Sequence, residues 1–321
     1  MRKKDTLTKQ YLARPDIFAD AFNYYLFDGK KVLRPKDLIE QDTTELAVIR
    51  KLGKLFTDQK MRDVLKLCTI RRSKQATLVL LGIEAQDMIS YVMPVRDNLY
   101  DALNYAAQVQ EIKRKHIEAN DLEDGAELMS GFTKEDRLLP VITLCICFDN
   151  TRWNAPKSLH EMFGKVDPRL KAYINDYKLN LITPDEITDF AKFTTGLGLA
   201  MEFIHHSSDK VKMNDIINSR PEYKSVDEDT VDIINAYTNA RISKNDMRGG
   251  KIDMCTAIQG LIEDGRTAGR TEGITEGITK GENMMIQLMK LLTPGTKEYD
   301  KAINGTSADR KRLYKKYNII D

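Results

Sequence analysis

The sequence predicts an α/β fold: a core with a mixed sheet, followed by an all-helical C-terminal region. Two β-rich runs follow each other between Met61 and Gln86, and a helical segment and a further apolar run come after them. From Lys165 onward the strand signal disappears. Strands separated by a crossover helix can pair in parallel, so the order helix, strands, helix, strand fits a mixed sheet.

Length and composition limit the alternatives. The chain has 321 residues, enough for one large domain with an appendage or for two domains. Hydrophobic residues make up 41% and charged residues 31%, a balance that supports a packed core and argues against wholesale disorder. The formal net charge of +2 excludes a histone-like protein, so contacts with nucleic acid must come from local basic clusters. We expect three parts: residues 1–165, 166–248 and 249–321.

The cysteines and the apolar runs indicate the cellular compartment in which the protein is expected. The four cysteines show no CxxC spacing and no zinc pattern, and Cys145 and Cys147 share one face of an apolar run. Both are therefore expected to be buried thiols. The N-terminus leads into no apolar signal region, and the longest near-apolar run, Leu138–Phe148, is too short to cross a bilayer. We expect a cytoplasmic protein that has no membrane partner.

The segment Pro15–Phe27 predicts a helix. Its apolar residues recur with helical spacing: Phe18, Phe22, Tyr25 and Leu26. A second face carries Asp20 together with Asp16 and Asn23, which are neighbours on a helix surface. That face is either solvated or contributes an acidic group to a site.

Polar residues stand at the start of the first β-rich run and at the end of the second, which are adjacent if the two runs form a hairpin. The first has Asp63 near its start, and the second, Thr77–Ile83, is almost wholly apolar, as a strand buried on both faces would be. Glu84 and Gln86 end the second run on the same face. The segment Arg71–Gln75 between the runs predicts a hairpin connection longer than two residues. Strands also end in polar residues simply where they reach solvent; the alternative is a metal site.

A strong helix is predicted from Met93 to Gln108, with Pro94 in its first turn. Its packing stripe consists of Leu99, Ala102, Leu103 and Ala106. Polar residues recur every four positions on another face: Arg96, Tyr100, Asn104 and Gln108. This row belongs either to a plain amphipathic helix or to a site. A charged connection over residues 111–136 then leads to the next buried strand, Leu138–Phe148.

An aspartate, a short gap and then Glu-x-Gln at the end of a hydrophobic strand resemble the PD-(D/E)xK nuclease fold in its Glu-x-Gln variant. The surrounding segments resemble the Rpn (recombination-promoting nuclease) family of bacteria, which also carries the label transposase: Arg62–Val64, Leu81–Gln86, Met93–Arg96 and Leu99–Tyr105. The sequence has no separate Asp-Asp-Glu integrase core and no recognisable helix-turn-helix. The resemblance extends over nearly the whole chain, including a glycine repeat and a basic ending.

The resemblance implies a restriction-endonuclease-like core in residues 1–165 and a metal-dependent DNA endonuclease that hydrolyses phosphodiester bonds and promotes recombination. It implies Mg²⁺ as the cofactor, with Mn²⁺ as a substitute, bound by Asp63, Glu84, the carbonyl of Ala85 and Asp20. Carboxylates are hard oxygen ligands of the kind that Mg²⁺ prefers. The third catalytic residue is Gln86, in the position of the lysine that gives the fold its name. An amide cannot take a proton, so it can only orient water or phosphate.

The expected DNA contacts are basic and polar side chains near the site: Arg62, Arg71, Arg72, Arg96 and Gln108. The glutamine in place of lysine leaves two functions open. The first is an active endonuclease, which the retained Asp63 and Glu84 favour. The second is a DNA-binding or assembly protein that has a vestigial nuclease site.

The C-terminal part predicts helices throughout. Capping boxes at Thr183–Glu186 and Ser225–Glu228 predict helices over about 184–204 and 226–247, with another at about 209–218. Between Gly265 and Gly281 a glycine recurs every fourth residue, along one side of a helix. Each glycine costs about 1 kcal/mol against alanine, which close packing on a partner helix would offset. The repeat is therefore either an interface that makes a homo-oligomer or a flexible linker.

Overall fold

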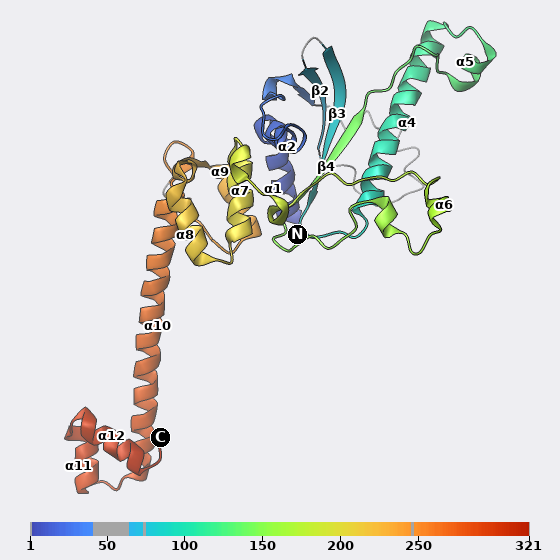
Figure 1. Cartoon of the computed structure of the whole chain (residues 1–321). Helices are drawn as coiled ribbons and strands as arrows, with labels where there is room; N and C mark the ends of the chain where they lie inside the picture. Colours follow the sequence, from blue (N-terminus) through green and yellow to red (C-terminus); the bar gives the residue numbers. More distant parts are fainter. Residues whose placement is uncertain (1, 41–63, 73–74, 245–246, 321) are drawn as a thin grey trace. The chain divides into compact units, whose positions relative to one another are not determined.

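The computed structural model describes residues 2–40, 64–72, 75–244 and 247–320 (Figure 1). The chain forms two compact units, residues 1–255 and 256–321. The first contains a mixed sheet with helices, and the second is helical. The predicted α/β class and helical C-terminal region are therefore confirmed at this level.

The main sheet of the described residues has five strands in the order of the chain. These are β1 (Leu38–Glu40), β2 (Val64–Arg72), β3 (Gln75–Gln86), β4 (Val141–Cys147) and β5 (Leu181–Ile182). The pairs β1–β2 and β2–β3 are antiparallel, whereas β3–β4 and β4–β5 are parallel. Helix α4 (Met93–Ala119) connects β3 to β4. The predicted mixed sheet is confirmed, and a crossover helix explains its parallel pair.

The hairpin between β2 and β3 is tighter than the sequence predicts. The strands pair from Val64 with Ile83 to Arg72 with Gln75. Only residues 73 and 74, which are not described, separate the last pair, so the predicted five-residue connection is wrong. Ladder pairing uses backbone groups and therefore continues through polar residues that the apolar pattern assigns to a turn.

One face of the sheet is covered by α1 (Arg2–Ala13) and α2 (Pro15–Phe27), and α2 has the predicted bounds. Helix α1 contacts β2 and β3. On this face the fully buried Lys66 of β2 donates from Nζ to the carbonyl of Ala13, 2.7 Å away. Its ammonium also lies 5.5 Å from the ring centroid of Phe18 in α2. Lysine 66 therefore ties the sheet to both helices.

The opposite face of the sheet packs against α4. Tyr105 of this helix packs on a buried cluster of Leu65, Leu80 and Val141 from three neighbouring strands. The helix runs on to Ala119, so the predicted surface connection over 111–136 begins nine residues too early. The sheet also buries Cys145 and Cys147 as free thiols, which confirms that prediction.

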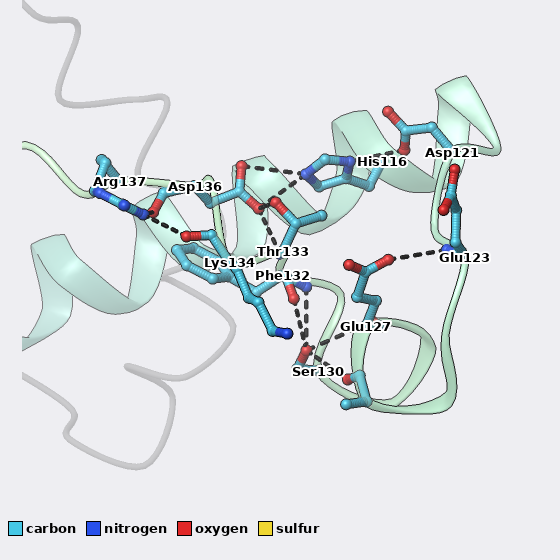
Figure 2. A network of polar contacts seen from close by, with 11 residues as sticks. His116, Asp121, Glu123, Glu127, Ser130, Phe132, Thr133, Lys134, Asp136 and Arg137 are labelled. Atoms are coloured by element: carbon cyan, nitrogen blue, oxygen red, sulfur yellow. Dashed lines mark hydrogen bonds and ion pairs between the residues drawn. The ribbon is translucent and has the colours of Figure 1, made fainter.

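His116, near the end of α4, contacts two aspartates of the segment that follows this helix (Figure 2). His116 Nδ1 lies 2.7 Å from Asp121 Oδ1, and its Nε2 lies 3.0 Å from Asp136 Oδ2. Asp136 also accepts hydrogen bonds from the backbone N–H and the hydroxyl of Thr133. The hydrogen bond to Asp121 is the largest cause that raises the pKa of His116, and Asp136 adds to it. The segment, which includes the short helix α5 (Gly125–Ser130), is thus fastened to the last turns of α4.

The α-helices of the remaining described chain are α6 (Pro168–Lys171), α7 (Gly196–His206), α8 (Lys210–Ser219), α9 (Glu228–Tyr237), α10 (Met254–Leu291), α11 (Lys297–Asn304) and α12 (Ser307–Lys316). Two short strands, β6 (Val226–Asp227) and β7 (Lys251–Ile252), pair with each other. The predicted absence of strands after Lys165 is therefore wrong, because two-residue strands leave no periodic pattern.

Both predicted capping boxes differ in the structure. The side chain of Thr183 caps no helix, and Pro184–Glu186 forms only a 3-10 turn before the α-helix that begins at Gly196. The carboxylate of Asp227 caps α9 by accepting from the backbone of Thr230, in place of the predicted Ser225. In each case several polar residues compete for the cap, and tertiary packing selects where the helix starts.

The predicted boundary after residue 165 lies inside the first compact unit. Helix α7 packs against α2 and α9, and α9 packs against α1. The hydroxyls of Tyr11 in α1 and Thr230 in α9 are 3.0 Å apart in the buried contact. Residues 166–248 therefore share a core with the sheet, because the N-terminal helices have apolar residues on more than one face.

Helix α10 is continuous through the glycine repeat, so residues 265–281 are helical (Figure 1). Gly265, Gly269, Gly273 and Gly277 are exposed and Gly281 is half-buried, and among the described residues nothing lies within 4 Å of a Cβ built on any of the five. A small core forms where α10 ends, from Leu288, Leu292, Ala302 and Leu313. Over the described stretches of the chain, no helix is both long and apolar enough to span a membrane.

Candidate functional site

The candidate site lies at the carboxyl end of β3, on the face that packs against α4. Glu84 pairs in register with Cys145 of β4, and Gln86 with Cys147. The alternation of a strand places Glu84 and Gln86 on the same face, as predicted. Glu84 is 2% exposed, so its carboxylate is held away from bulk water.

Arg96, in the first turns of α4, joins both side chains. Its Nη2 donates to Glu84 Oε1, and its Nη1 lies 3.5 Å from Gln86 Oε1. The amide Nε2 of Gln86 donates to Glu84 Oε1 at 3.2 Å and to the carbonyl of Ala85 at 2.9 Å. Four of the predicted site residues therefore form one contiguous polar cluster: Glu84, Ala85, Gln86 and Arg96.

The guanidinium of Arg96 is held in its charged form. Burial opposes the charge on Arg96, but Glu84, Tyr100 and Asp97 outweigh it and raise the pKa of the guanidinium above its ordinary value. Burial raises the pKa of the Cys145 thiol well above its ordinary value, with a further contribution from Asp97. This thiol is therefore protonated and is no candidate nucleophile.

Helix α4 brings two more carboxylates to this face, which were not predicted as site residues. Asp97 is fully buried. Asp101, one turn further on, accepts from the hydroxyl of Thr143 in β4 and from the hydroxyl of Tyr177, 2.7 Å away. A signal for them exists: two acids spaced i, i+4 on the helix that directly follows the strand ending in Glu84.

The predicted partner carboxylate, Asp63, and the predicted DNA contact Arg62 lie outside the described residues. The first described residue of β2, Val64, pairs with Ile83, which immediately precedes Glu84. Glu84 and the carbonyl of Ala85 are hard oxygen donors of the type that suits Mg²⁺. Among the described residues no group of three or more His, Cys, Asp or Glu side chains could hold a metal ion.

Asp20 takes part in a different contact. It is 2% exposed, and both of its carboxylate oxygens accept hydrogen bonds from Thr194 and Thr195, whose backbone N–H groups and hydroxyls all donate at 2.6–3.0 Å. Thr195 in turn caps α7, where its hydroxyl accepts from the backbone of Leu197. Asp20 therefore joins α2 to the start of α7, a structural role that the sequence did not reveal.

Three predicted DNA contacts lie away from Glu84. Arg71 and Arg72 are at the opposite end of the hairpin, seven or eight residues along β2 from Val64, or about 24–27 Å at 3.4 Å per residue. The amide of Gln108 donates to and accepts from the backbone of Leu139. It lies twelve residues from Arg96 along α4, or about 18 Å. The expected basic cluster around the site is thus wrong for Arg71 and Arg72, because a long straight hairpin separates its two ends.

Comparison with known proteins found no matching family model, no matching curated protein and no matching solved structure. The resemblance to the Rpn family therefore stays a prediction from the sequence.

Proposed function

We propose that the chain is a metal-dependent DNA endonuclease that hydrolyses phosphodiester bonds and acts in recombination. The observation that supports it best is the β2–β3 register. The residue next to Asp63 in the sequence, Val64, pairs with the residue next to Glu84. In the sequence, an acid at each of these two positions, followed by Gln86, makes up the Asp and Glu-x-Gln pattern of the PD-(D/E)xK fold in its Glu-x-Gln variant.

In this proposal Asp63, Glu84 and the carbonyl of Ala85 would hold Mg²⁺ or Mn²⁺. When bound, the ion supplies charge neutralisation on the phosphate and a water of lowered pKa. Gln86 already has its amide directed at Glu84 and Ala85, so it would orient water beside the ion and carry no proton. Arg96, which pairs with Glu84, would supply a positive charge for the phosphate.

DNA is the proposed partner, and its contacts extend beyond the reacting phosphate. Arg71 and Arg72, at the other end of the hairpin, would bind backbone phosphates that flank the cleaved bond. Such contacts carry no sequence information and weaken with salt. A homo-oligomer through residues 249–321 is part of the same proposal, supported by the exposed glycine side of α10.

One observation favours a second function, a DNA-binding or assembly protein with a vestigial nuclease site. Arg96 already occupies the Glu84 carboxylate, and the described residues contain no cluster of three acids that could hold a metal. In that case the ion pair is a structural element of the fold.

Cleavage of supercoiled plasmid over a series of Mg²⁺ concentrations tests the proposal. The variants are Glu84→Gln and Asp63→Asn, with Glu111→Gln as the matched control, an exposed acid on α4. Loss of at least about 100-fold in rate for the first two, with an unchanged control, is the expected result. Wild-type protein that binds DNA with a strong salt dependence and never cleaves it would instead support the vestigial site.

A further inference from the structure

The carboxylate of Glu84 needs a positive partner in every state of the protein. It is almost fully buried at the end of β3. A buried carboxylate without a counter-charge costs several kcal/mol. In the described residues Arg96 provides that charge, through a direct ion pair with Oε1.

Arg96 is also suited to leave this position. The side chain of Arg96 is 24% exposed, whereas that of Glu84 is 3% exposed. Arg96 also lies 3.5 Å from Gln86 Oε1 and 3.7 Å from the sulfur of Met93, and it hydrogen-bonds to Tyr100 of its own helix. The neighbouring Asp97 adds a further negative charge that favours the guanidinium. If another cation binds Glu84, the guanidinium of Arg96 still has the carboxylate of Asp97 near it.

We propose that Arg96 is a positioning residue that takes the place of the divalent cation on Glu84 in the metal-free protein and competes with it. This inference rests on the proposed function, since it requires a metal at Glu84. A metal ion and a guanidinium on the same oxygen repel each other, so binding of the ion displaces Arg96. The Arg96–Glu84 ion pair therefore lowers the metal affinity of the site, and it keeps the carboxylate in position until the metal arrives.

The experiment is titration of Mn²⁺ into the full-length protein without DNA, followed by calorimetry and by the electron paramagnetic resonance signal of free Mn²⁺. It is done near pH 8, well above the ordinary pKa of a glutamate, about 4.3. The variants are Arg96→Gln, which removes the charge, and Arg96→Lys, which keeps it. Arg114→Gln is the matched control: an exposed arginine of the same helix that pairs with Glu111 and Glu118.

The expected result is that Arg96→Gln binds Mn²⁺ at least about ten-fold more tightly than wild type, about 1.4 kcal/mol. Arg96→Lys and Arg114→Gln should stay within about three-fold of wild type, about 0.65 kcal/mol. Tight binding by Arg96→Gln together with undetectable binding by wild type also supports the proposal. If Arg96 only held Glu84 in position for the ion, its removal would leave the carboxylate less ordered and would lower the affinity.

Two results overturn the inference, and they can be told apart. If wild type binds Mn²⁺ and Arg96→Gln binds it no more tightly, the competition is refuted while the proposed metal site stands. If neither protein binds Mn²⁺, both the competition and the proposed metal-dependent function fail. Circular dichroism melting shows whether Arg96→Gln is folded, and if it unfolds, Arg96→Met, which keeps the apolar stem, replaces it in the same titration.

Discussion

Substitution of Asp20 tests whether this residue joins α2 to the start of α7, as the structure indicates, or binds a metal, as the sequence predicts. The substitution is Asp20→Asn, which keeps the size of the side chain and removes one of its two acceptor oxygens. In the structure two backbone N–H groups and two hydroxyls from Thr194 and Thr195 donate to this carboxylate. The asparagine NH₂ would face some of these donors.

The magnitude follows from the burial of the group. Hydrogen bonds to a charged group contribute about 1.5–3 kcal/mol each, and a buried donor left without an acceptor costs about 1–3 kcal/mol. One lost bond and one orphaned donor give a loss of about 3 kcal/mol in the free energy of unfolding for Asp20→Asn. For a unit of this size that lowers the melting temperature by about 6–12 °C.

The assay is chemical and thermal unfolding of the full-length protein followed by circular dichroism. Asp16→Asn is the control on the same helix, because Asp16 is 44% exposed and pairs with Arg14. An exposed ion pair of this kind contributes less than about 1 kcal/mol. A Thr194→Val variant, alone and combined with Asp20→Asn, measures the coupling between the two side chains. If Asp20→Asn is as stable as wild type and loses Mn²⁺ binding, Asp20 is a metal ligand and this reasoning is wrong.

Three further predictions address the other elements. For an active site, Gln86→Ala should lower the plasmid cleavage rate by about 10- to 100-fold, or about 1.4 to 2.7 kcal/mol, while Gln86→Lys preserves or raises it; equal rates in all three proteins would deny Gln86 an orienting role. The pKa of His116 is raised in the folded protein, so the contacts with Asp121 and Asp136 stabilise most below pH 6.5 and lose this effect as the pH rises through the folded pKa. Hydrogen exchange of residues 120–137 should therefore quicken with pH beyond its intrinsic dependence, and His116→Gln should remove that excess; an excess that persists in the variant contradicts the assignment. Finally, Gly273→Ala with Gly277→Ala should stabilise α10 by about 1 kcal/mol per site, because a Cβ meets nothing there. If the glycine side joins two chains, the same double variant should sediment as a smaller species than wild type, and an unchanged mass would refute that interface.

Several elements follow from the sequence alone, because they depend on local pattern. The period of apolar residues and Pro15 define α2 with its observed bounds. Successive side chains of a strand point to opposite faces, so the spacing of two residues places Glu84 and Gln86 on the same face of β3. Pro94 marks the beginning of α4, and the apolar run around Cys145 predicts a buried strand.

Only the tertiary structure decided the partners of these residues. No local pattern indicates that Arg96 pairs with Glu84, that Asp20 caps the segment before α7, or that Arg71 lies far from Glu84 along the hairpin. The physical reason is that sequence periodicity reports which face of an element a side chain occupies. Which group it meets there depends on how distant segments pack, and residues 20 and 195 come together only because α2 and α7 share a core.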